Sequence, residues 1–390
     1  MIGPLLAVLL IASCNEDPTS IGSQLIPGGD YLDFQVVNSY DDTLQQNSSY
    51  FTENIDLKRS TIILLGKDDN LESWMLMRFY MLFPDSILSP FQNDSINILS
   101  TKVEMRPSYY FGDSLGTFDF TVHKVYTAWT PGGFNKDSMD VLDYDAVNYA
   151  SSMSITDSVI TFDLESSVVI DWLKRTYDES QPENHGLLFK PTANTTRIFG
   201  FPGYDAYSQE FLTRISIVCE KQGEFVDTVN VIPFSDVHAV KGTVPPSDPE
   251  NIMLQAGLAS RGSLYFDLSR IPLTSVVNRA TIQLFVDTLE TVNGSITSDS
   301  VAFTIWDNST EHLIDSTVSF QYAVRDIGQA YYEGEVTKLV QEWINGTPNE
   351  GFRISLSDEA RSVNHVAIKG SNSADPAIRP RLKVIYSKKM

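Results

Sequence analysis

Two loops of the sequence place aromatic residues beside glycine and proline. The first loop carries Tyr126, Trp129 and Phe134, and the second carries Tyr204 and Tyr207. Flat aromatic rings on a surface can stack against sugar rings or contact a protein partner. The same rings can instead close a loop against the fold beneath it. These five residues are the candidate ligand-binding residues, and both interpretations stay open.

A serine motif is the strongest catalytic candidate in the sequence. Gly112-Asp113-Ser114-Leu115-Gly116 has the G-x-S-x-G spacing, which in a nucleophile elbow lies between a strand and a helix. Here the residues on both sides alternate like strands, and no Asp-x-x-His partner motif occurs, so a hairpin turn is predicted. Nucleotide-binding loops, His-Glu-x-x-His and Cys-x-x-Cys are also missing from the sequence. No catalytic residue, metal ligand or cofactor is predicted, and the chain is not expected to be an enzyme.

The first residues have the pattern of a secretion signal. Residues 5–12 form an apolar run that is shorter than the roughly 20 residues needed to span a bilayer. The run ends in Leu10-Ile11-Ala12-Ser13-Cys14, which resembles the bacterial lipobox. We therefore expect a signal peptide at 1–13 and a lipid on Cys14 that anchors the protein to a membrane. The alternative is an ordinary signal peptide followed by a chance cysteine.

The segment after Cys14 has the composition of a tether. Asn15-Glu16-Asp17 resembles the acidic stretch that directs lipoproteins of Bacteroidota to the outer face of the outer membrane, although a solvated acidic spacer explains it equally. The following residues are rich in glycine and proline, so 14–33 is predicted to be a lipidated, flexible tether. The expected location is the outer membrane, facing the cell exterior.

Composition limits the possible partners. The formal net charge of −22 repels phosphate backbones, so no nucleic-acid partner is expected. Hydrophobic residues make up 42% of the chain, which is enough for sizeable cores. There are two cysteines, so a disulfide framework is excluded, and Cys219 lies in an alternating strand pattern that predicts a buried core thiol.

A short pattern of Asp, then Ser or Thr, then an aliphatic, Met or Thr residue recurs along the chain. It resembles the O-glycosylation sequon of Bacteroidota envelope proteins. The same dipeptides also open turns into strands, and this second interpretation carries equal weight. The candidate acceptor residues are Thr43, Ser86, Ser95, Ser114, Ser138, Ser158, Thr228, Thr288, Ser300 and Ser316.

Strand patterns dominate, and they repeat. Helical periodicity is confined to two short segments, each with a tryptophan, Trp172 or Trp343, followed by an Asn-x-Gly turn and an apolar strand. Further landmarks occur in the same order upstream of both helices, which indicates a tandem duplication. Both tryptophans are predicted to be core anchors. The predicted β-rich domains are 34–221 and 229–390, joined by a linker at 222–228.

The second copy carries a resemblance to a known family. The matching residues are Asp236 and the segments 251–254, 264–272, 336–346 and 379–382. They resemble the tandem modules of bacterial surface proteins named for a DNRLRE motif, which are classed among carbohydrate-binding modules. The whole chain also resembles a surface lipoprotein family of Bacteroidota. The resemblance implies an all-β fold of two tandem jelly-roll-like β-sandwich domains, each with one short helix.

Two roles follow as expectations. The first is a lipid-anchored, surface-exposed protein of the outer membrane that acts in binding or adhesion without catalysis, with polysaccharide as the candidate ligand. The second is a structural subunit of an outer-membrane secretion or gliding assembly. The expected partners are accordingly the membrane, reached through the N-terminal lipid, and either a polysaccharide or an outer-membrane protein.

Overall fold

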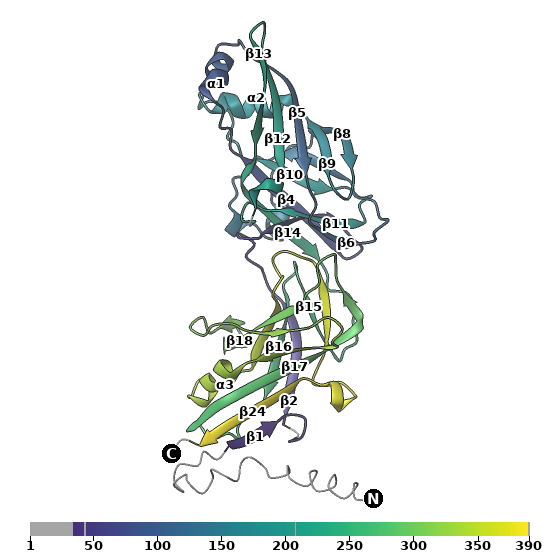
Figure 1. Cartoon of the computed structure of the whole chain (residues 1–390), viewed down its shortest axis with the longest axis vertical. Helices are drawn as coiled ribbons and strands as arrows, with labels where there is room; N and C mark the ends of the chain where they lie inside the picture. Colours follow the sequence, from purple (N-terminus) through teal and green to yellow (C-terminus); the bar gives the residue numbers. More distant parts are fainter. Residues whose placement is uncertain (1–33, 43, 207, 389–390) are drawn as a thin grey trace, which may run out of the picture.

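The computed structural model of the chain describes residues 34–42, 44–206 and 208–388. Most of its regular structure is strand, and the strands gather into two lobes stacked along the long axis of the molecule (Figure 1). Each lobe has a large hydrophobic core of its own. The predicted all-β class is therefore confirmed. Within the described residues, no helix is both long enough and apolar enough to cross a membrane.

The first lobe contains two sheets. The larger has the strand order β6-β11-β3-β4-β10-β7, and β14 also pairs with β4. Its strands are β3 (Ile62–Lys67), β4 (Leu71–Phe79), β6 (Tyr109–Gly112), β7 (Phe120–Lys124), β10 (Leu187–Pro191), β11 (Arg197–Pro202) and β14 (Pro233–Gly242). The smaller sheet, ordered β13-β12-β5-β9-β8, consists of β5 (Asn97–Met105), β8 (Ala150–Ile155), β9 (Ile160–Leu164), β12 (Arg214–Lys221) and β13 (Phe225–Val231). Phe120 of β7 meets Phe162 of β9 with ring centroids 5.8 Å apart, so the core lies between the two sheets.

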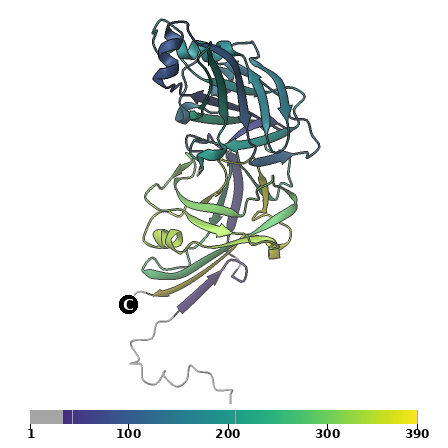
Figure 2. The same ribbon diagram turned by 45° about the horizontal axis from the view of Figure 1, so that its top comes forward.

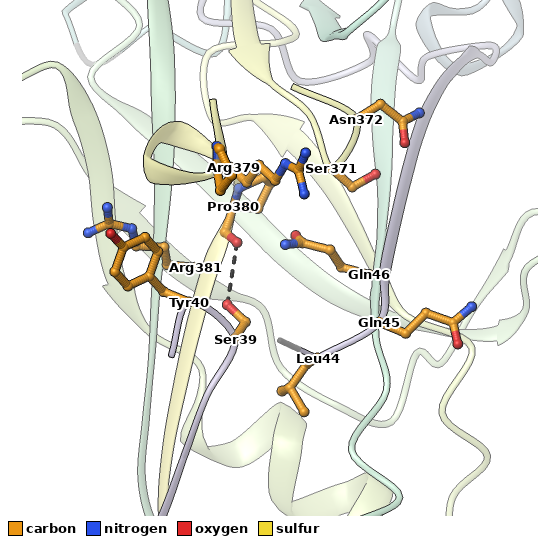
Figure 3. A pocket seen from close by; sticks show the side chains of 11 residues that line it. Ser39, Tyr40, Leu44, Gln45, Gln46, Ser371, Asn372, Arg379, Pro380 and Arg381 are labelled. Carbon is orange, nitrogen blue, oxygen red and sulfur yellow. Dashed lines mark hydrogen bonds between the residues drawn. The ribbon is translucent and has the colours of Figure 1, made fainter. Parts of the chain in front are cut away.

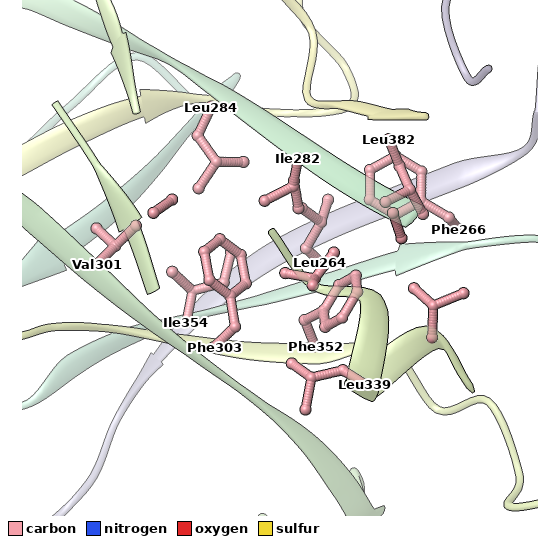
Figure 4. Packing of buried hydrophobic residues seen from close by; sticks show 14 of the residues in the cluster. Leu264, Phe266, Ile282, Leu284, Val301, Phe303, Leu339, Phe352, Ile354 and Leu382 are labelled. Atoms are coloured by element: carbon pink, nitrogen blue, oxygen red, sulfur yellow. The ribbon is translucent and has the colours of Figure 1, made fainter. Parts of the chain in front are cut away.

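The second lobe is formed by one 12-stranded sheet that curls back on itself. The long strand β17 (Ser275–Val292) pairs with β24 and β21 along its first part and with β23 along its last part, which closes a circuit of strands. The other strands are β15 (Asn251–Gln255), β16 (Ser260–Phe266), β18 (Ser300–Asn308), β19 (Leu313–Ile314), β20 (Gln321–Val324), β21 (Tyr331–Glu335), β22 (Phe352–Leu356), β23 (His365–Lys369), β24 (Arg381–Lys388), β1 (Phe34–Asn38) and β2 (Gln46–Thr52). Alternate residues point inward, as Figure 4 shows for Leu264 of β16 and Ile354 of β22. Full burial of such a side chain contributes about 1.5–3 kcal/mol to the free energy of folding.

Three α-helices lie in the described part of the chain. They are α1 (Asp85–Gln92) and α2 (Ser166–Arg175) in the first lobe and α3 (Thr337–Ile344) in the second, and short 3-10 turns lie at Pro131–Gly133, Ser138–Asp140, Gln209–Phe211 and Pro376–Ile378. The ring of Trp172 in α2 stacks on Phe79 at 6.2 Å, and Trp343 in α3 lies 4.6 Å from Phe352. Both tryptophans are buried, so the prediction that they are core anchors is confirmed.

Helix α1 corrects the prediction of one helix in each domain. Pro90 lies inside it, and proline removes a backbone hydrogen bond from a helix interior, so the sequence favours a loop there. Ile87 and Phe91, one turn apart, are buried and hold the short helix against the core. Tertiary packing therefore overrides local propensity at this point.

The Asn-x-Gly turn of the first lobe ties the strand after α2 to β4. Asn184 donates from its side chain to the carbonyl of Phe79 at 2.9 Å, and it accepts from the amide of Gly186 at 2.9 Å. Gly186 has φ +85°, and a Cβ there would meet the carbonyl oxygen of Met77 at 2.1 Å. Only glycine fits this close approach.

The second lobe repeats this turn in detail. Asn349 donates to the carbonyl of Phe266 at 2.8 Å and accepts from the amide of Gly351 at 3.2 Å. Gly351 has φ +93° and faces the carbonyl of Leu264. These residues stand at the positions that the sequence repeat pairs with those of the first lobe, which supports a common origin for the two copies.

The strands that open the described chain pair with the second lobe. β1 runs antiparallel to β24, with Phe34 opposite Ser387, and β2 runs antiparallel to β16, with Thr52 opposite Ser260. In both views β2 runs along the second lobe toward the first (Figure 1 and Figure 2). The C-terminal lobe is therefore completed by the N-terminal residues 34–52.

Strand β14 is exchanged in the opposite direction, into the first lobe. The sequence assigns it to the start of the second domain, but it pairs with β4 from Pro233 opposite Phe79 to Gly242 opposite Leu71. The strand β13, which overlaps the predicted linker 222–228, pairs with β12. Both strands therefore belong to the first lobe.

The predicted boundaries 34–221 and 229–390 are corrected accordingly. The chain crosses between the lobes at 53–61 and at 243–250, and neither segment contains a strand. Side-chain alternation identifies a strand and its buried face, but it does not identify the sheet edge that the strand joins. In a duplicated fold, the edges of both copies can accept similar strands.

Candidate ligand-binding surface

The loop that carries Trp129 lies over the outer face of the larger sheet of the first lobe. Trp129 is 7% exposed and Phe134 is 3% exposed, and both pack with Leu76 and Val237 in a small core. The loop covers the apolar residues on this outer face and so removes them from water, which is favourable. Of the two interpretations that the sequence leaves open, loop closure therefore describes Trp129 and Phe134, which pack against the sheet.

The same two rings still reach a hollow in the surface. The hollow has a volume of about 310 Å³, and Trp129 and Phe134 form part of its wall together with Thr130, Ser138 and Val141. Val141 is largely exposed at its rim. The lining combines flat apolar surface with hydroxyl groups. A sugar ring has apolar C–H faces and hydroxyl groups, so both parts of the lining can contact it.

Arg78 of β4 lies against the ring of Trp129. Its guanidinium carbon is 4.9 Å from the ring centroid, and a terminal nitrogen donates to the carbonyl oxygen of Trp129 at 3.0 Å. On another side the guanidinium is 6.0 Å from the ring of Phe234. Burial lowers the pKa of Arg78, and the nearby Glu183 opposes this. The Nε of Arg78 is buried and has no hydrogen-bond partner among the described residues.

Two exposed rings extend the surface outward from Arg78. Phe234 is 40% exposed and Tyr80 is 62% exposed, and they meet edge to face at 5.9 Å. Together with Arg78 and Trp129 they form a continuous group of aromatic and cationic contacts, which we call the Arg78 surface. The cation–π contacts with these rings restrict the movement of the Arg78 guanidinium.

Tyr126 and Tyr204 make other contacts. Tyr126 is 51% exposed, and its hydroxyl donates to Asp145 at 3.0 Å, which raises the pKa of Tyr126. Tyr204 is 41% exposed, and its backbone amide donates to Asp236 at 2.7 Å. Tyr207, like Cys14, lies outside the described residues. Among the described residues, no ring or cation–π contact joins Tyr126 or Tyr204 to Arg78, Trp129, Phe234 or Tyr80.

Arg78, Phe234 and Tyr80 were not predicted as site residues. A signal existed for Arg78, since it is a basic residue near the end of a largely apolar strand pattern and is followed directly by two aromatic residues. Phe234 offered none, because it reaches Arg78 only through the pairing of β14 with β4. That pairing depends on the exchange of strands between the copies.

The serine motif forms a turn. Gly112 ends β6, the amide of Gly116 donates to the carbonyl of Asp113 at 2.9 Å, and the chain continues toward β7. No helix follows Ser114, so the strand-to-helix geometry of a nucleophile elbow does not form there. Within the described residues, His, Cys, Asp and Glu side chains form no group of three or more that could hold a metal ion.

Cys219 is fully buried in the first core, as predicted. Burial raises the pKa of its thiol to about 11. The thiolate, which is the reactive form, is therefore disfavoured at neutral pH.

The nine candidate glycosylation sites that the structure describes lie at the surface. Thr43 is outside the described residues, and none of the other nine is buried: Ser86, Ser95, Ser114, Ser158, Thr228, Thr288 and Ser316 are exposed, and Ser138 and Ser300 are partly exposed. At several sites the aspartate also makes a turn, as Asp113 does by accepting from the amide of Leu115 at 2.9 Å. The turn interpretation holds at those sites and leaves the hydroxyl groups accessible.

No model of a known protein family matches this chain, and no curated protein is significantly similar to it in sequence.

Proposed function

We propose that the protein is a lipid-anchored, surface-exposed lipoprotein of the outer membrane that binds polysaccharide without catalysis. In this proposal each lobe is a jelly-roll-like β-sandwich, and Cys14 carries the lipid. The observation that carries the binding role is the Arg78 surface, where two exposed rings lie beside a partly buried arginine. The arginine contacts Trp129, which also lines the hollow of about 310 Å³.

Sugar rings fit this surface for two reasons. The exposed faces of Phe234 and Tyr80 offer apolar area to the C–H faces of a pyranose. The guanidinium of the partly exposed Arg78 offers N–H donors to hydroxyl or carboxylate oxygens. Because the chain as a whole carries −22, we expect a neutral or sparsely charged polysaccharide rather than a polyanion.

The strand exchange supports an outward orientation of the surface. The tether leads into β1, and β1 pairs with β24 at the end of the second lobe far from the first (Figure 1). An anchor on Cys14 therefore attaches to the second lobe. The Arg78 surface lies on the first lobe, away from that attachment.

A structural subunit of an outer-membrane assembly is the second candidate. It is favoured by one observation, namely that Tyr80 and Phe234 are exposed and in contact, and that Leu82, two residues after Tyr80, is 72% exposed. Exposed apolar side chains that lie together also suit a protein partner.

The test is binding of the Cys14→Ala protein to a panel of purified polysaccharides. Phe234→Ala and Tyr80→Ala should each weaken binding by up to about tenfold, since a contact with one aromatic ring contributes about 0.5–1.5 kcal/mol to the binding free energy. The matched control is Tyr322→Ala, which removes a ring that is 54% exposed on the second lobe. Unchanged binding in both variants rules out this surface as the sugar site. Binding of a stoichiometric envelope protein that depends on Leu82 and Tyr80, without any sugar binding, supports the structural role instead.

A further inference from the structure

One hollow of the second lobe has walls that are distant in sequence. It has a volume of about 480 Å³ and lies between the β1–β2 connection and the segment 371–381, where the hydroxyl of Ser39 donates to the carbonyl of Pro380 at 3.4 Å (Figure 3). Its two arginines, Arg379 and Arg381, point to opposite sides of Pro380. This hollow therefore does not bring its charged groups together on one ligand.

Another hollow of the second lobe combines polar groups with apolar surface. It has a volume of about 410 Å³ and lies where β16 and α3 end. The buried side chains of Trp343 and Ile344 form part of its floor, and Leu273, which is 69% exposed, forms part of its rim. Tyr265 in β16 and Asp267, directly after β16, line it as well. We call it the Asp267 hollow.

The Asp267 hollow lies at the position in the second lobe that the Arg78 surface has in the first. The glycine of each Asn-x-Gly turn faces the carbonyl of the residue before Arg78 in the first lobe and of the residue before Tyr265 in the second. The exchanged strands also correspond, since Ser235 of β14 lies opposite Arg78 and Asn47 of β2 lies opposite Tyr265. The duplication therefore places a surface hollow or an aromatic surface at the same strand end in both lobes.

The charge of the hollow selects among ligands. Asp267 is the only charged residue in its lining. The amide of Ser269 donates to Asp267 at 3.0 Å, and this hydrogen bond lowers the pKa of the Asp267 carboxyl. The carboxylate is therefore ionised at neutral pH and can only accept hydrogen bonds. An anionic ligand would be repelled here, whereas a ligand with hydroxyl groups can donate to Asp267.

Two further side chains offer hydrogen-bonding groups in the same lining. They are Tyr265 and Thr347, which are both partly exposed. Their hydroxyl groups form no hydrogen bond with another described residue, so both can bond to a ligand. The ring of Tyr265 and the side chain of Leu273 supply apolar surface beside these hydroxyl groups. Such a lining has partners for both the C–H faces and the hydroxyl groups of a sugar.

We propose that the Asp267 hollow binds an uncharged sugar residue, so that each lobe has a sugar site of its own. The ligand class rests on the proposed function, but the residues of the hollow are separate from those of the Arg78 surface. A polysaccharide repeats its sugar units, so two sites on one protein bind it with avidity, which raises affinity by about 10²–10⁴ when both sites are engaged.

The test uses the Cys14→Ala protein with Tyr80→Ala and Phe234→Ala added, because this background removes the exposed rings of the Arg78 surface. In titration calorimetry it should bind one molecule of a short neutral oligosaccharide, taken from a panel built on glucose, mannose, galactose or xylose. Asp267→Asn should weaken this binding by about five- to tenfold. Its amide oxygen still accepts from Ser269, but a neutral hydrogen bond to the sugar replaces a charge-assisted one.

Tyr265→Ala should weaken the same binding by up to about tenfold, because it removes the aromatic ring. The second lobe offers a matched control for each variant. Asp315 accepts from the amide of Thr317 at 2.9 Å in a similar turn, and Tyr322 is 54% exposed. Asp315→Asn and Tyr322→Ala should bind like the background protein. Thermal unfolding checks that every variant is folded.

The background protein separates failure of this inference from failure of the proposed site. Sugar binding that persists in it and is weakened by Asp267→Asn supports the Asp267 hollow, even if the Arg78 surface binds no sugar. The proposal is overturned if no oligosaccharide binds in this background, or if Asp267→Asn and Tyr265→Ala both bind like it. It is also overturned if oligolysine binds at Asp267 more tightly than every sugar, since the hollow is then a site for cations. Sugar binding at the Arg78 surface alone overturns only this inference.

Discussion

The hydroxyl of Tyr109 in the first lobe donates a hydrogen bond of 2.8 Å to the side-chain oxygen of Asn364 in the second. The same hydroxyl accepts from the amide of Val363 at 3.1 Å, and Asn364 also accepts from the amide of Gly294 at 2.7 Å. Tyr109 and Asn364 are both 0% exposed. Burial raises the pKa of Tyr109, so the phenol stays protonated and keeps its donor. This contact fixes one lobe against the other.

Removing this hydroxyl should weaken the junction. Tyr109→Phe leaves the amide of Val363 without its acceptor in a buried site, which costs about 1–3 kcal/mol of unfolding free energy. Chemical denaturation measures the loss. Tyr110→Phe is the control, since this hydroxyl belongs to the next residue of the same strand and bonds to the carbonyl of Asp157 at an exposed site. Equal losses in the two variants would show that the junction contributes little.

The strand exchange predicts which fragments fold. A fragment covering 53–242 contains every strand of the first lobe, including β13 and β14, so it should unfold cooperatively on its own. A fragment covering 229–390, the domain predicted from the sequence, lacks β1 and β2 and leaves the edges of β24 and β16 unpaired. We expect it to be unfolded or aggregated, because unpaired edges and an incomplete core favour association.

Addition of a peptide covering 34–52 provides the second half of this test. It should restore cooperative unfolding to the fragment 229–390, as judged by circular dichroism and by dispersion of amide signals in NMR spectra. A fragment 229–390 that folds without the peptide contradicts the exchange.

Sequence patterns gave the strand content and the repeat because these depend on local alternation. The positions of Trp172 and Trp343 beside buried phenylalanines follow from the same local pattern. The partners of β2 and β14 could not be predicted, since two copies of one fold offer similar sheet edges. For the same reason the sequence could not bring Phe234 to Arg78, or Ser39 to Pro380.

A buried charge cluster beside the crossing segment 53–61 should be important for stability. Arg261 donates to both carboxylate oxygens of Glu359, each at 2.7 Å, and forms a further ion pair with Glu53. Arg353 lies 3.3 Å from Glu53, and the side chains of all four residues are at most 18% exposed. Arg261→Met leaves two carboxylates without their main partner, so we expect a loss of about 3–5 kcal/mol in unfolding free energy.

The control for this cluster is an exposed ion pair. Lys241 and Asp140 lie 2.5 Å apart, with side chains 51% and 63% exposed. Lys241→Met should change the unfolding free energy by no more than about 1 kcal/mol, because water screens such a pair. If Arg261→Met costs no more than Lys241→Met, the cluster does not hold the crossing segment in place.

The carboxyl group of Asp236 should make stability depend on pH. Asp236 is 7% exposed and stands opposite Met77 of the core, and burial raises its pKa to about 7, with the hydrogen bond from Tyr204 opposing the rise. In the unfolded chain the group ionises near its usual pKa of about 3.9. Between these values the folded state binds more protons than the unfolded state, so this group lowers stability as pH rises from about 4 to about 7, with no further loss above that.

Asp236→Asn should remove this dependence, since the amide oxygen can still accept from Tyr204 and cannot ionise. The measurement is the unfolding free energy of the parent and the variant at pH 5 and pH 8. As pH rises, we expect the unfolding free energy of the variant to increase relative to that of the parent. From about pH 4 to pH 7 this difference amounts to up to about 4 kcal/mol, which corresponds to a pKa difference of about three units between the folded and unfolded states. A difference that stays constant between the two pH values would mean that Asp236 is already ionised in the folded protein, and that the interior of β14 is open enough to water to stabilise the charge.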